Sequence, residues 1–357
     1  MKISYVPGRE LSYSRTRTFV HGLEQQGVDL RFYGMHCLSY WKRLAMVPFK
    51  FLFRKQRDED IVLIGYFGQL LTIILKPFIR KPLVLDAYLS VYDSLVFDKK
   101  KFKPGSLGAK LAYWLDTKSC NIADKVFVDT DEHIDYFSRT FQIPKEKFSR
   151  ILIGADDGLF KPQKEKPSKK FIVGFHGLFI PLQGVEYIVQ AANLLKEEDI
   201  EFHLVGKGQT YEACVKLARE YTLPNVKFLG LKKPNEIPDF IAGLDIGLGI
   251  FGETEKTQRV IPNKAYEIIA MKKPLLTADT PAIRELFAHK KNAYLCKAKN
   301  PPSLAEGILA LKKNSSLRKT LAEEGYKTYI AYCTPQRIGK EIVNVCKELI
   351  SYTKSGN

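Results

Sequence analysis

The sequence predicts an α/β fold in which two parallel β-sheets, each covered by helices, form two separate domains. Short apolar runs alternate with helical stretches along the whole chain, and this repeated strand–helix order is typical of parallel sheets covered on both faces. A stretch rich in Gly, Asp, Pro and Lys, GADDGLFKPQKEKPSKK from residue 154, interrupts the order near the middle of the chain. The length of 357 residues is sufficient for two domains that each bury a core.

The first part of the chain supplies one strand–helix series. Its predicted strands span residues 3–6, 28–33, 61–66, 83–88, 125–130 and 150–153, and two of its predicted helices span residues 16–26 and 107–123. This order indicates a Rossmann-like domain, in which ligands gather beyond the carboxyl ends of the strands. The loops that follow these strand ends carry Gly8, Arg9, Arg15, Arg17, Gly65, Gly68, Tyr92, Asp93, Asp131 and His133.

Two of these loops bear on the chemistry. Gly8 starts no GxGxxG motif, so a dinucleotide fingerprint is absent. His133 stands in TDEHIDYF, at or near a predicted helix start. It is a candidate general acid or base or a substrate contact, and the alternative is a solvent-facing histidine without a role.

One segment of the first domain points to membranes. Residues 41–57, WKRLAMVPFKFLFRKQR, hold six basic residues and no acidic one. At about 100° per residue they predict an interfacial helix with two opposite stripes. The apolar stripe is Trp41, Ala45, Pro48 and Leu52, and the basic stripe is Arg43, Lys50, Arg54 and Arg57. Pro48 predicts a kink or break, and the alternative is a basic helix packed on its own sheet.

The second part of the chain repeats the strand–helix order after the linker. Its predicted strands span residues 171–175, 202–205, 226–229, 246–250, 275–278 and 293–296, and its helices include residues 185–196 and 211–220. The first three strands end in the turns HGLFIPLQGVEY, GKGQT and GLKKP. Glycines in these turns allow a ligand to approach the backbone, and Gly184 opens a helix whose N–H groups are suited to a diphosphate. A plain tight turn is the alternative for each glycine taken alone.

The stretch 260–280, VIPNKAYEIIAMKKPLLTADT, combines a helix start with charged side chains. Pro262 predicts that a helix begins at or just after it. Lys264 then lies in the first turn, where the helix dipole favours a cation only if an anion is also bound. Glu267 follows three residues later on nearly the same face. The pattern therefore predicts an anion site with a carboxylate beside it, and a surface ion pair is the alternative.

Composition narrows the class of protein. The formal net charge of +17 favours a polyanionic substrate, a nucleic acid or an acidic membrane surface. Nucleic acid is disfavoured because no aromatic–basic recognition motif accompanies the charge. Cys37, Cys120, Cys214, Cys296, Cys333 and Cys346 form no CxxC or zinc-type cluster. We therefore expect a reduced, cytosolic protein without structural metal, signal peptide or transmembrane segment.

These motifs together resemble GT-B glycosyltransferases of the family 4 type. The resemblance covers nearly all of the second half and, more loosely, the first half. It implies a nucleotide diphosphate sugar bound mainly by the second domain, a cleft between two Rossmann-like domains, retention of anomeric configuration, and no metal. It also implies an acceptor domain at 1–156, a donor domain at 157–335, and a last helix within 336–357 that crosses back to the first domain.

The resemblance carries over residue by residue in the second domain. It implies that Glu267 holds the donor ribose, that Gly177 and Gly184 form the diphosphate turn, and that residues 205–208 and 228–230 form the nucleoside pocket. The implied donor-binding residues are Gly177, Gly184, Gly206, Lys207, Gly208, Leu229, Gly230, Pro262, Asn263, Lys264 and Glu267.

The sequence departs from the family pattern at three places. Arg259 stands where many members carry the first glutamate of a Glu-x7-Glu pair, and the Pro262-Asn263-Lys264 variant replaces that pattern. Leu178 and Gln183 stand where an Arg and a Lys commonly neutralise the diphosphate. The histidine common after the fourth strand is also missing. Compensation of the leaving charge is therefore expected from Lys264, with Lys207, Arg259, Arg15 or Arg17.

The leading hypothesis is a retaining glycosyltransferase that works on a lipid-linked or cell-envelope glycan at the cytoplasmic face of the membrane. Its predicted partners are the nucleotide-sugar donor, the membrane-associated acceptor and an anionic membrane surface bound through 41–57. Lys264, Glu267, Asp93 and His133 are the catalytic candidates, and Arg15, Arg17, Tyr92 and Asp93 are the acceptor-side candidates. The alternative is a catalytically weak GT-B-like nucleotide-binding protein.

Overall fold

The computed structural model describes residues 1–357 except 11, 35–38, 55–56, 100, 165–169 and 356–357. The side chains of Tyr40, Trp41, Lys354 and Ser355 also lie outside the described part, and Cys37 falls in the gap at 35–38. The chain divides into two compact units, Met1–Asp156 with Thr334–Asn357, and Asp157–Cys333. Each unit holds one six-stranded parallel sheet covered by helices, which confirms the predicted α/β class.

The sheet of the first unit has the order β2-β1-β3-β4-β5-β6. Its strands are β1 (Lys2–Val6), β2 (Asp29–Phe32), β3 (Ile61–Ile64), β4 (Leu83–Tyr88), β5 (Lys125–Val128) and β6 (Phe148–Arg150). The prediction was wrong for the last strand, because residues 151–153 follow β6 and do not form it. Their side chains are buried, so the apolar run marks burial beside the sheet and not pairing within it.

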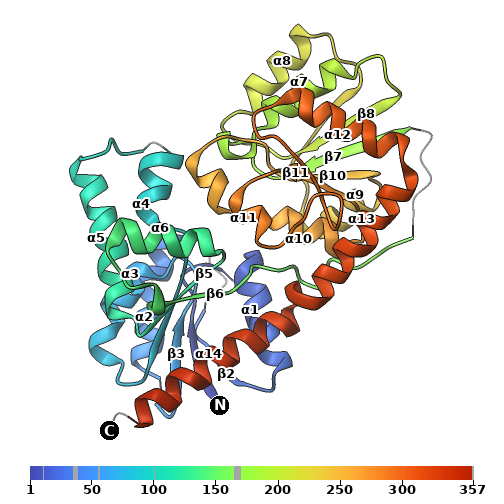
Figure 1. Ribbon diagram of the computed structural model, residues 1–357. Coiled ribbons are helices and arrows are strands. Elements are labelled where there is room, and N and C mark those ends of the chain that lie inside the picture. Colours follow the sequence, from blue (N-terminus) through green and yellow to red (C-terminus); the bar gives the residue numbers. More distant parts are fainter. Residues whose placement is uncertain (11, 35–38, 55–56, 100, 165–169, 356–357) are drawn as a thin grey trace. The chain divides into compact units, whose positions relative to one another are not determined.

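Two layers of helices cover this sheet (Figure 1). The helices are α1 (Ser14–Gln25), α2 (Tyr40–Leu52), α3 (Gln69–Leu75), α4 (Val91–Asp93), α5 (Leu107–Ile122), α6 (Asp131–Phe141) and α14 (Pro335–Ser355), with short turns η1 (Lys76–Phe78), η2 (Ser94–Asp98) and η3 (Lys145–Lys147). Helices α1 and α14 pack together on one face, and α2, α3 and α5 are successive neighbours on the other.

Successive side chains along a strand pack alternately against these two helix layers. Ile61 and Leu63 of β3 join the core beneath α1 and α14, whereas Val62 and Ile64 join the core beneath α2, α3 and α5. This period of two is the expected result when both faces of a strand are covered. Hence nearly every residue of the central strands is apolar and buried.

Helix α2 differs from the predicted interfacial helix. It runs through Pro48 without a break. Arg43 is 3% exposed and its Nη1 lies 3.2 Å from Glu10 Oε2, while Arg54 pairs with Glu59 at 2.5 Å. Two members of the predicted basic stripe are thus buried in ion pairs. Their partners are Glu10, which is distant in sequence, and Glu59, which lies beyond the end of the helix. Ala45, from the predicted apolar stripe, is exposed instead.

The sheet of the second unit has the order β12-β11-β10-β7-β8-β9. Its strands are β7 (Phe171–His176), β8 (Ile200–Val205), β9 (Val226–Gly230), β10 (Ile246–Leu248), β11 (Leu275–Ala278) and β12 (Tyr294–Cys296). Its helices are α7 (Val185–Leu194), α8 (Tyr211–Glu220), α9 (Ile237–Ala242), α10 (Asn263–Ala270), α11 (Pro281–Arg284), α12 (Pro301–Lys313) and α13 (Ser315–Thr328), with turns η4 (Pro181–Gln183), η5 (Pro234–Glu236), η6 (Glu255–Arg259) and η7 (Tyr329–Cys333).

The strand order reverses at β7, with β8 and β9 on one side and β10 to β12 on the other. A reversal of this kind opens a crevice at the carboxyl ends of the strands, where ligands bind in open α/β sheets. Across the described residues of both units, every helix is too short or too polar to cross a bilayer.

Candidate active site

The loops after β7, β8 and β9 are joined to one another by backbone hydrogen bonds. Gly177 N donates to Val205 O at 3.0 Å, and Gly206 N donates to Gly230 O at 2.7 Å. Phe179 N donates to Lys207 O at 3.0 Å. The three glycine turns singled out from the sequence therefore form one continuous edge of the sheet.

Two glycines at this edge have no room for a side chain. A Cβ on Gly206 would lie 1.8 Å from Gly177 O, and Gly206 has φ +135°. A Cβ on Gly184 would lie 2.5 Å from Gly252 N, and Gly184 has φ +64°. Gly184 is also the N-cap of α7 without a side-chain cap, so the first N–H groups of α7 keep their capacity to bind an anion.

Lys264 reaches this edge from α10. The helix begins at Asn263 with Pro262 as its N-cap, as predicted. Lys264 is only 4% exposed, and its Nζ lies 3.7 Å from the centre of the Phe175 ring. Nζ also donates to Gln183 Oε1 and lies 3.0 Å from the position that a Cβ on Gly177 would take. The ammonium is thus placed between the turn after β7 and the segment that leads into α7.

The charge of Lys264 is only partly compensated by its surroundings. Within the described residues it forms no salt bridge, since its close contacts are an amide oxygen and an aromatic ring. Burial holds the pKa of Lys264 well below its ordinary value, and the charge of Glu267 works in the opposite direction. An anion bound beside Nζ would restore the compensation that burial removes.

Glu267 has a partner that the sequence did not reveal. His176, the last residue of β7, has its Nε2 2.7 Å from Glu267 Oε2, and the two side chains are 7% and 14% exposed. His176 Nδ1 is buried and has no hydrogen-bond partner in the described part of the chain. The residues around His176 in the sequence do not indicate a functional role. The role becomes apparent only in the structure, where α10 brings Glu267 next to the end of β7.

The remaining donor-side candidates lie around this centre. Lys207 is exposed, and its Nζ lies 3.7 Å from the centre of the Tyr211 ring. Leu229 is 40% exposed beside Gly230, which has φ +67°. Leu178 is 61% exposed at the turn after β7. Gln183, the residue in place of the expected cation, instead holds Lys264.

In the first unit, two candidates are internal. Arg15 is fully buried, and its Nη2 donates to Asp86 Oδ1 at 2.7 Å while Nη1 donates to Ile151 O at 3.1 Å. His133 is 2% exposed, and its Nδ1 lies 2.5 Å from Asp129 Oδ1. Neither is the exposed contact that the sequence suggested, because each is occupied by a buried aspartate. Arg17 pairs with Asp156 at 2.7 Å.

Tyr92 and Asp93 belong to a turn that is held from inside the protein. The backbone N–H groups of Val91 and Tyr92 donate to the buried carboxylate of Asp116 at 3.1 and 2.8 Å. Burial raises the pKa of Asp116 to about 6, and those hydrogen bonds oppose the rise. Asp93 is 3% exposed. The carboxylate of Asp116 therefore satisfies the backbone N–H groups at the start of α4.

An aromatic cluster that was not predicted from the sequence lies in the loops that follow the strands of the first sheet. The ring of Tyr66 lies 4.9 Å from that of Tyr13 and 4.8 Å from that of Tyr88. Phe67 and Tyr88 have φ of +66° and +53°. Left-handed backbone at non-glycine residues is costly and is concentrated at functional sites, so these loops are a candidate functional region of the first unit.

The second unit supplies a defined set of chemical functions. It has a buried ammonium, a carboxylate bound to a histidine, a helix start without a side-chain cap, and glycines that admit a ligand to the backbone. Such a set can hold a diphosphate at Lys264 and α7 and hydroxyl groups at Glu267.

Comparison with known proteins identifies the family that the second unit resembles. Residues 156–328 match the family described as glycosyl transferases group 1. The glycosyltransferase MJ1178 of Methanocaldococcus jannaschii is 30% identical over 151 residues, which are 42% of this chain and 41% of that protein. The putative teichuronic acid biosynthesis glycosyltransferase TuaH of Bacillus subtilis is 24% identical over 214 residues, 58% of this chain and 51% of that protein. The chain thus spans about half or less of the length of these two relatives.

The fold is shared over the whole chain. The structure of HepE from Anabaena in complex with UDP-glucose superposes with a TM-score of 0.73 and covers 98% of this chain and 100% of that one, at 16% identity. At this identity the likeness concerns the fold alone. It confirms the α/β class and the GT-B architecture of two Rossmann-like domains.

Proposed function

We propose that this chain, whose residues 156–328 match the glycosyl transferases group 1 family, is a glycosyltransferase that uses a nucleoside diphosphate sugar. The observation that carries it is Lys264, a cation with 4% exposure at a glycine-lined strand edge, whose close contacts among the described residues are the amide oxygen of Gln183 and the ring of Phe175. A buried lysine in this setting is costly unless an anion binds beside it. A diphosphate leaving group is such an anion.

The bond from the sugar C1 to the diphosphate oxygen breaks while the acceptor oxygen bonds to C1. The proton of the acceptor hydroxyl passes to the departing diphosphate oxygen. Lys264 and the N–H groups at the start of α7 stabilise the negative charge that develops on the diphosphate, and Glu267 accepts hydrogen bonds from the ribose. This charge compensation comes from the protein alone, so no metal is required. Departure and attack on one face give retention, as in the family 4 type.

The acceptor is a cell-envelope or lipid-linked glycan at the cytoplasmic membrane face. Three observations support this part: the relative TuaH is named for teichuronic acid biosynthesis, the chain has a net charge of +17, and segment 41–57 is basic with exposed aromatic side chains. Cations near an anionic leaflet each contribute about 1 kcal/mol. A protein held there meets a lipid-linked acceptor at high local concentration.

Thermal-shift measurements on the whole chain with nucleoside diphosphates and their sugars test the function. At least one nucleotide should raise the melting temperature, since a ligand at about 100 times its Kd stabilises the folded state by about 2.7 kcal/mol. The stabilising nucleotide sugar should then be consumed with an acceptor, and NMR of the product should show the anomeric configuration retained. If no nucleotide stabilises the protein, the proposed function is wrong, and stabilisation without turnover favours the nucleotide-binding alternative.

Binding of the nucleoside diphosphate should take up a proton. The depressed pKa of Lys264 rises when a diphosphate lies beside it, so the fraction of free protein with neutral Lys264 gains a proton on binding. Affinity therefore falls as pH rises above the pKa of the free site. Isothermal titration in buffers of different ionisation enthalpy measures the uptake. Lys264→Arg should bind without it, because a guanidinium is already protonated; equal proton uptake in both proteins would contradict the assignment.

A further inference from the structure

The exposed apolar side chains of the first unit are concentrated on one layer of helices. Of the ten large hydrophobic side chains that are exposed among the described residues of this unit, nine belong to α2, α3, α5 and the short turns beside them. These nine are Met46, Phe49, Phe53, Ile74, Phe78, Phe97, Leu107, Leu111 and Trp114, and the tenth is Tyr352 on α14.

The spacing of these residues gives α5 a second apolar face. Leu107, Leu111 and Trp114 are 85%, 63% and 49% exposed and recur at the interval of one helical stripe. The opposite side of α5 is already buried, through Ala112 and Cys120. A surface helix that only covers a core has one apolar stripe, so the outer stripe of α5 calls for a partner of its own.

Helix α2 repeats this arrangement. Met46, Phe49 and Phe53 are 47%, 62% and 72% exposed, whereas Val47 and Phe51 pack in the core. The rings of Phe49 and Phe53 lie 4.4 Å apart and form one exposed aromatic pair. Helix α3 lies between α2 and α5, and it contributes Ile74 to the same outer surface, followed by Phe78 in η1.

The exposed charges of three segments that carry or flank this surface are all positive. The exposed side chains of the three segments 42–50, 76–81 and 99–118 include Lys42, Lys50, Arg80, Lys81, Lys99, Lys101, Lys103, Lys110 and Lys118. Acidic residues in these segments are confined to Asp116, which is fully buried. Asp98 immediately precedes the run of lysines.

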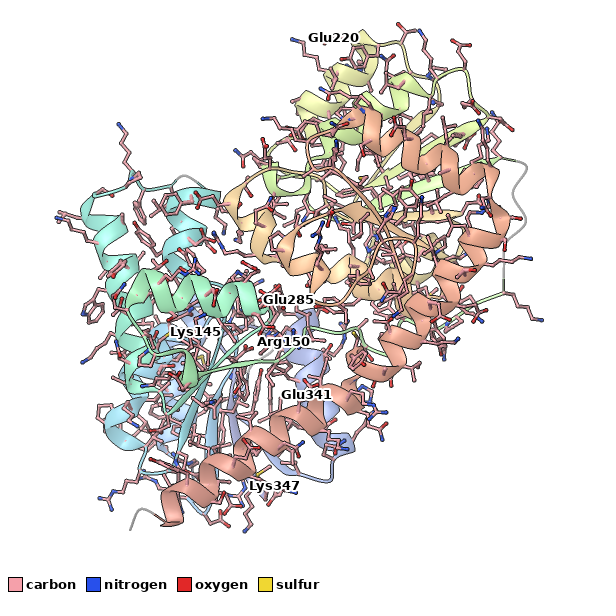
Figure 2. All side chains as sticks on the ribbon, in the orientation of Figure 1. Lys145, Arg150, Glu220, Glu285, Glu341 and Lys347 are labelled. Carbon is pink, nitrogen blue, oxygen red and sulfur yellow. The ribbon has the colours of Figure 1, made fainter. Side chains whose placement is uncertain are left out.

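The opposite layer has a different character. Figure 2 labels Glu341 and Lys347 on α14, so both signs of charge occur along that helix. Among the described residues of the first unit, the layer of α2, α3 and α5 thus combines most of the exposed large apolar side chains with a surrounding excess of cations.

We infer that the outer face of α2, α3 and α5 binds an anionic lipid surface. Leu107, Leu111 and Trp114 at the α5 end and Phe49 and Phe53 at the α2 end enter the interface, while the surrounding lysines contact lipid headgroups. This surface extends well beyond segment 41–57 and includes α5 as a second contact. The purpose of this lipid binding, to bring a lipid-held acceptor to the enzyme, rests on the proposed function. The binding itself can be measured without turnover.

Flotation of the whole protein with vesicles of phosphatidylcholine, alone or mixed equally with phosphatidylglycerol, tests the inference. The wild type should float with the anionic vesicles and be released by salt. Leu107→Ser/Leu111→Ser and Phe49→Ser/Phe53→Ser should each weaken partitioning by about tenfold or more. Leu194→Ser/Ile330→Ser is the matched control, because it removes two side chains that are 56% and 46% exposed in the other unit. Equal flotation of all four proteins overturns the inference.

Tryptophan emission locates the contact. Trp114 is one of only two tryptophans in the chain, so Trp41→Phe leaves it as the single reporter. Its emission should shift to the blue with anionic vesicles and be quenched by brominated lipid. Unshifted emission while the protein floats would remove α5 from the contact. A dimer of the wild type that the serine variants lose in sedimentation would instead assign this face to a second copy.

These results are separable from the proposed function. The serine variants should keep the wild-type thermal shift with nucleoside diphosphates and the wild-type rate on a water-soluble acceptor. If the protein binds lipid but does not transfer sugar, the lipid-binding inference stands and the proposed function is wrong. If it transfers sugar but does not bind lipid, the proposed function stands and the lipid-binding inference is wrong. Circular dichroism melts verify that each serine variant is folded.

Discussion

Replacing Lys264 by methionine is expected to lower kcat for sugar transfer by about 100- to 1,000-fold, the usual effect of removing one donor from a site where charge develops in the transition state. The side chain is 4% exposed beside the turn after β7, so water cannot replace the missing charge well. Leu178 and Gln183 add no further cation at this turn. Steady-state kinetics with a stabilising nucleotide sugar measures the loss.

Stability should change in the other direction. Methionine has a similar length and fills the space beside Phe175, and its thioether carries no charge to desolvate. We therefore expect Lys264→Met to melt at or above the wild-type temperature. Lys290→Met is a control for the substitution itself, because Lys290 Nζ also lies near a ring, 5.8 Å from the centre of Tyr294. An unchanged kcat in Lys264→Met would show that Lys264 does not contact the leaving group.

Local signals in the sequence were sufficient for most of the fold. The strand at Leu83–Tyr88 is buried on both faces because both helix layers cover it, and its predicted bounds are those of β4. Pro262 fixes the start of α10 through its own backbone. Such features depend on neighbours in the chain, which the sequence displays directly.

Features set by distant partners could not be predicted in this way. The sequence pattern places Arg15 among the loop cations, but its side chain is buried in the core. There it pairs with Asp86, which lies 71 residues away in sequence. The helical spacing places Arg43 in a basic stripe, but its side chain is buried in an ion pair with Glu10. His176 gains its importance from Glu267, 91 residues later. In contrast, the stripe on α5 could have been found, since Leu107, Leu111 and Trp114 recur at helical spacing among lysines.

Lys264 and Glu267 should differ in the kinetic constant that they affect. Charge on the diphosphate grows as the bond to the sugar breaks, so the loss of Lys264 falls on kcat. The ribose hydroxyls do not react, so their hydrogen bonds to Glu267 contribute equally to the ground state and the transition state. Removal of such uniform binding raises KM and leaves kcat nearly unchanged.

Glu267→Ala is accordingly expected to raise the donor KM by about 10- to 100-fold, since a hydrogen bond to a charged group contributes about 1.5–3 kcal/mol. Glu267→Gln guards against misfolding, because it keeps a side-chain oxygen that can accept from His176 Nε2. A donor that lacks ribose hydroxyls provides the decisive comparison. This deoxy donor should bind to the wild type more weakly than the natural donor does. The two donors should bind to Glu267→Ala with equal affinity. If the deoxy donor loses as much affinity for the variant as for the wild type, the ribose is held elsewhere, and Glu267 then acts by fixing His176 at the end of β7.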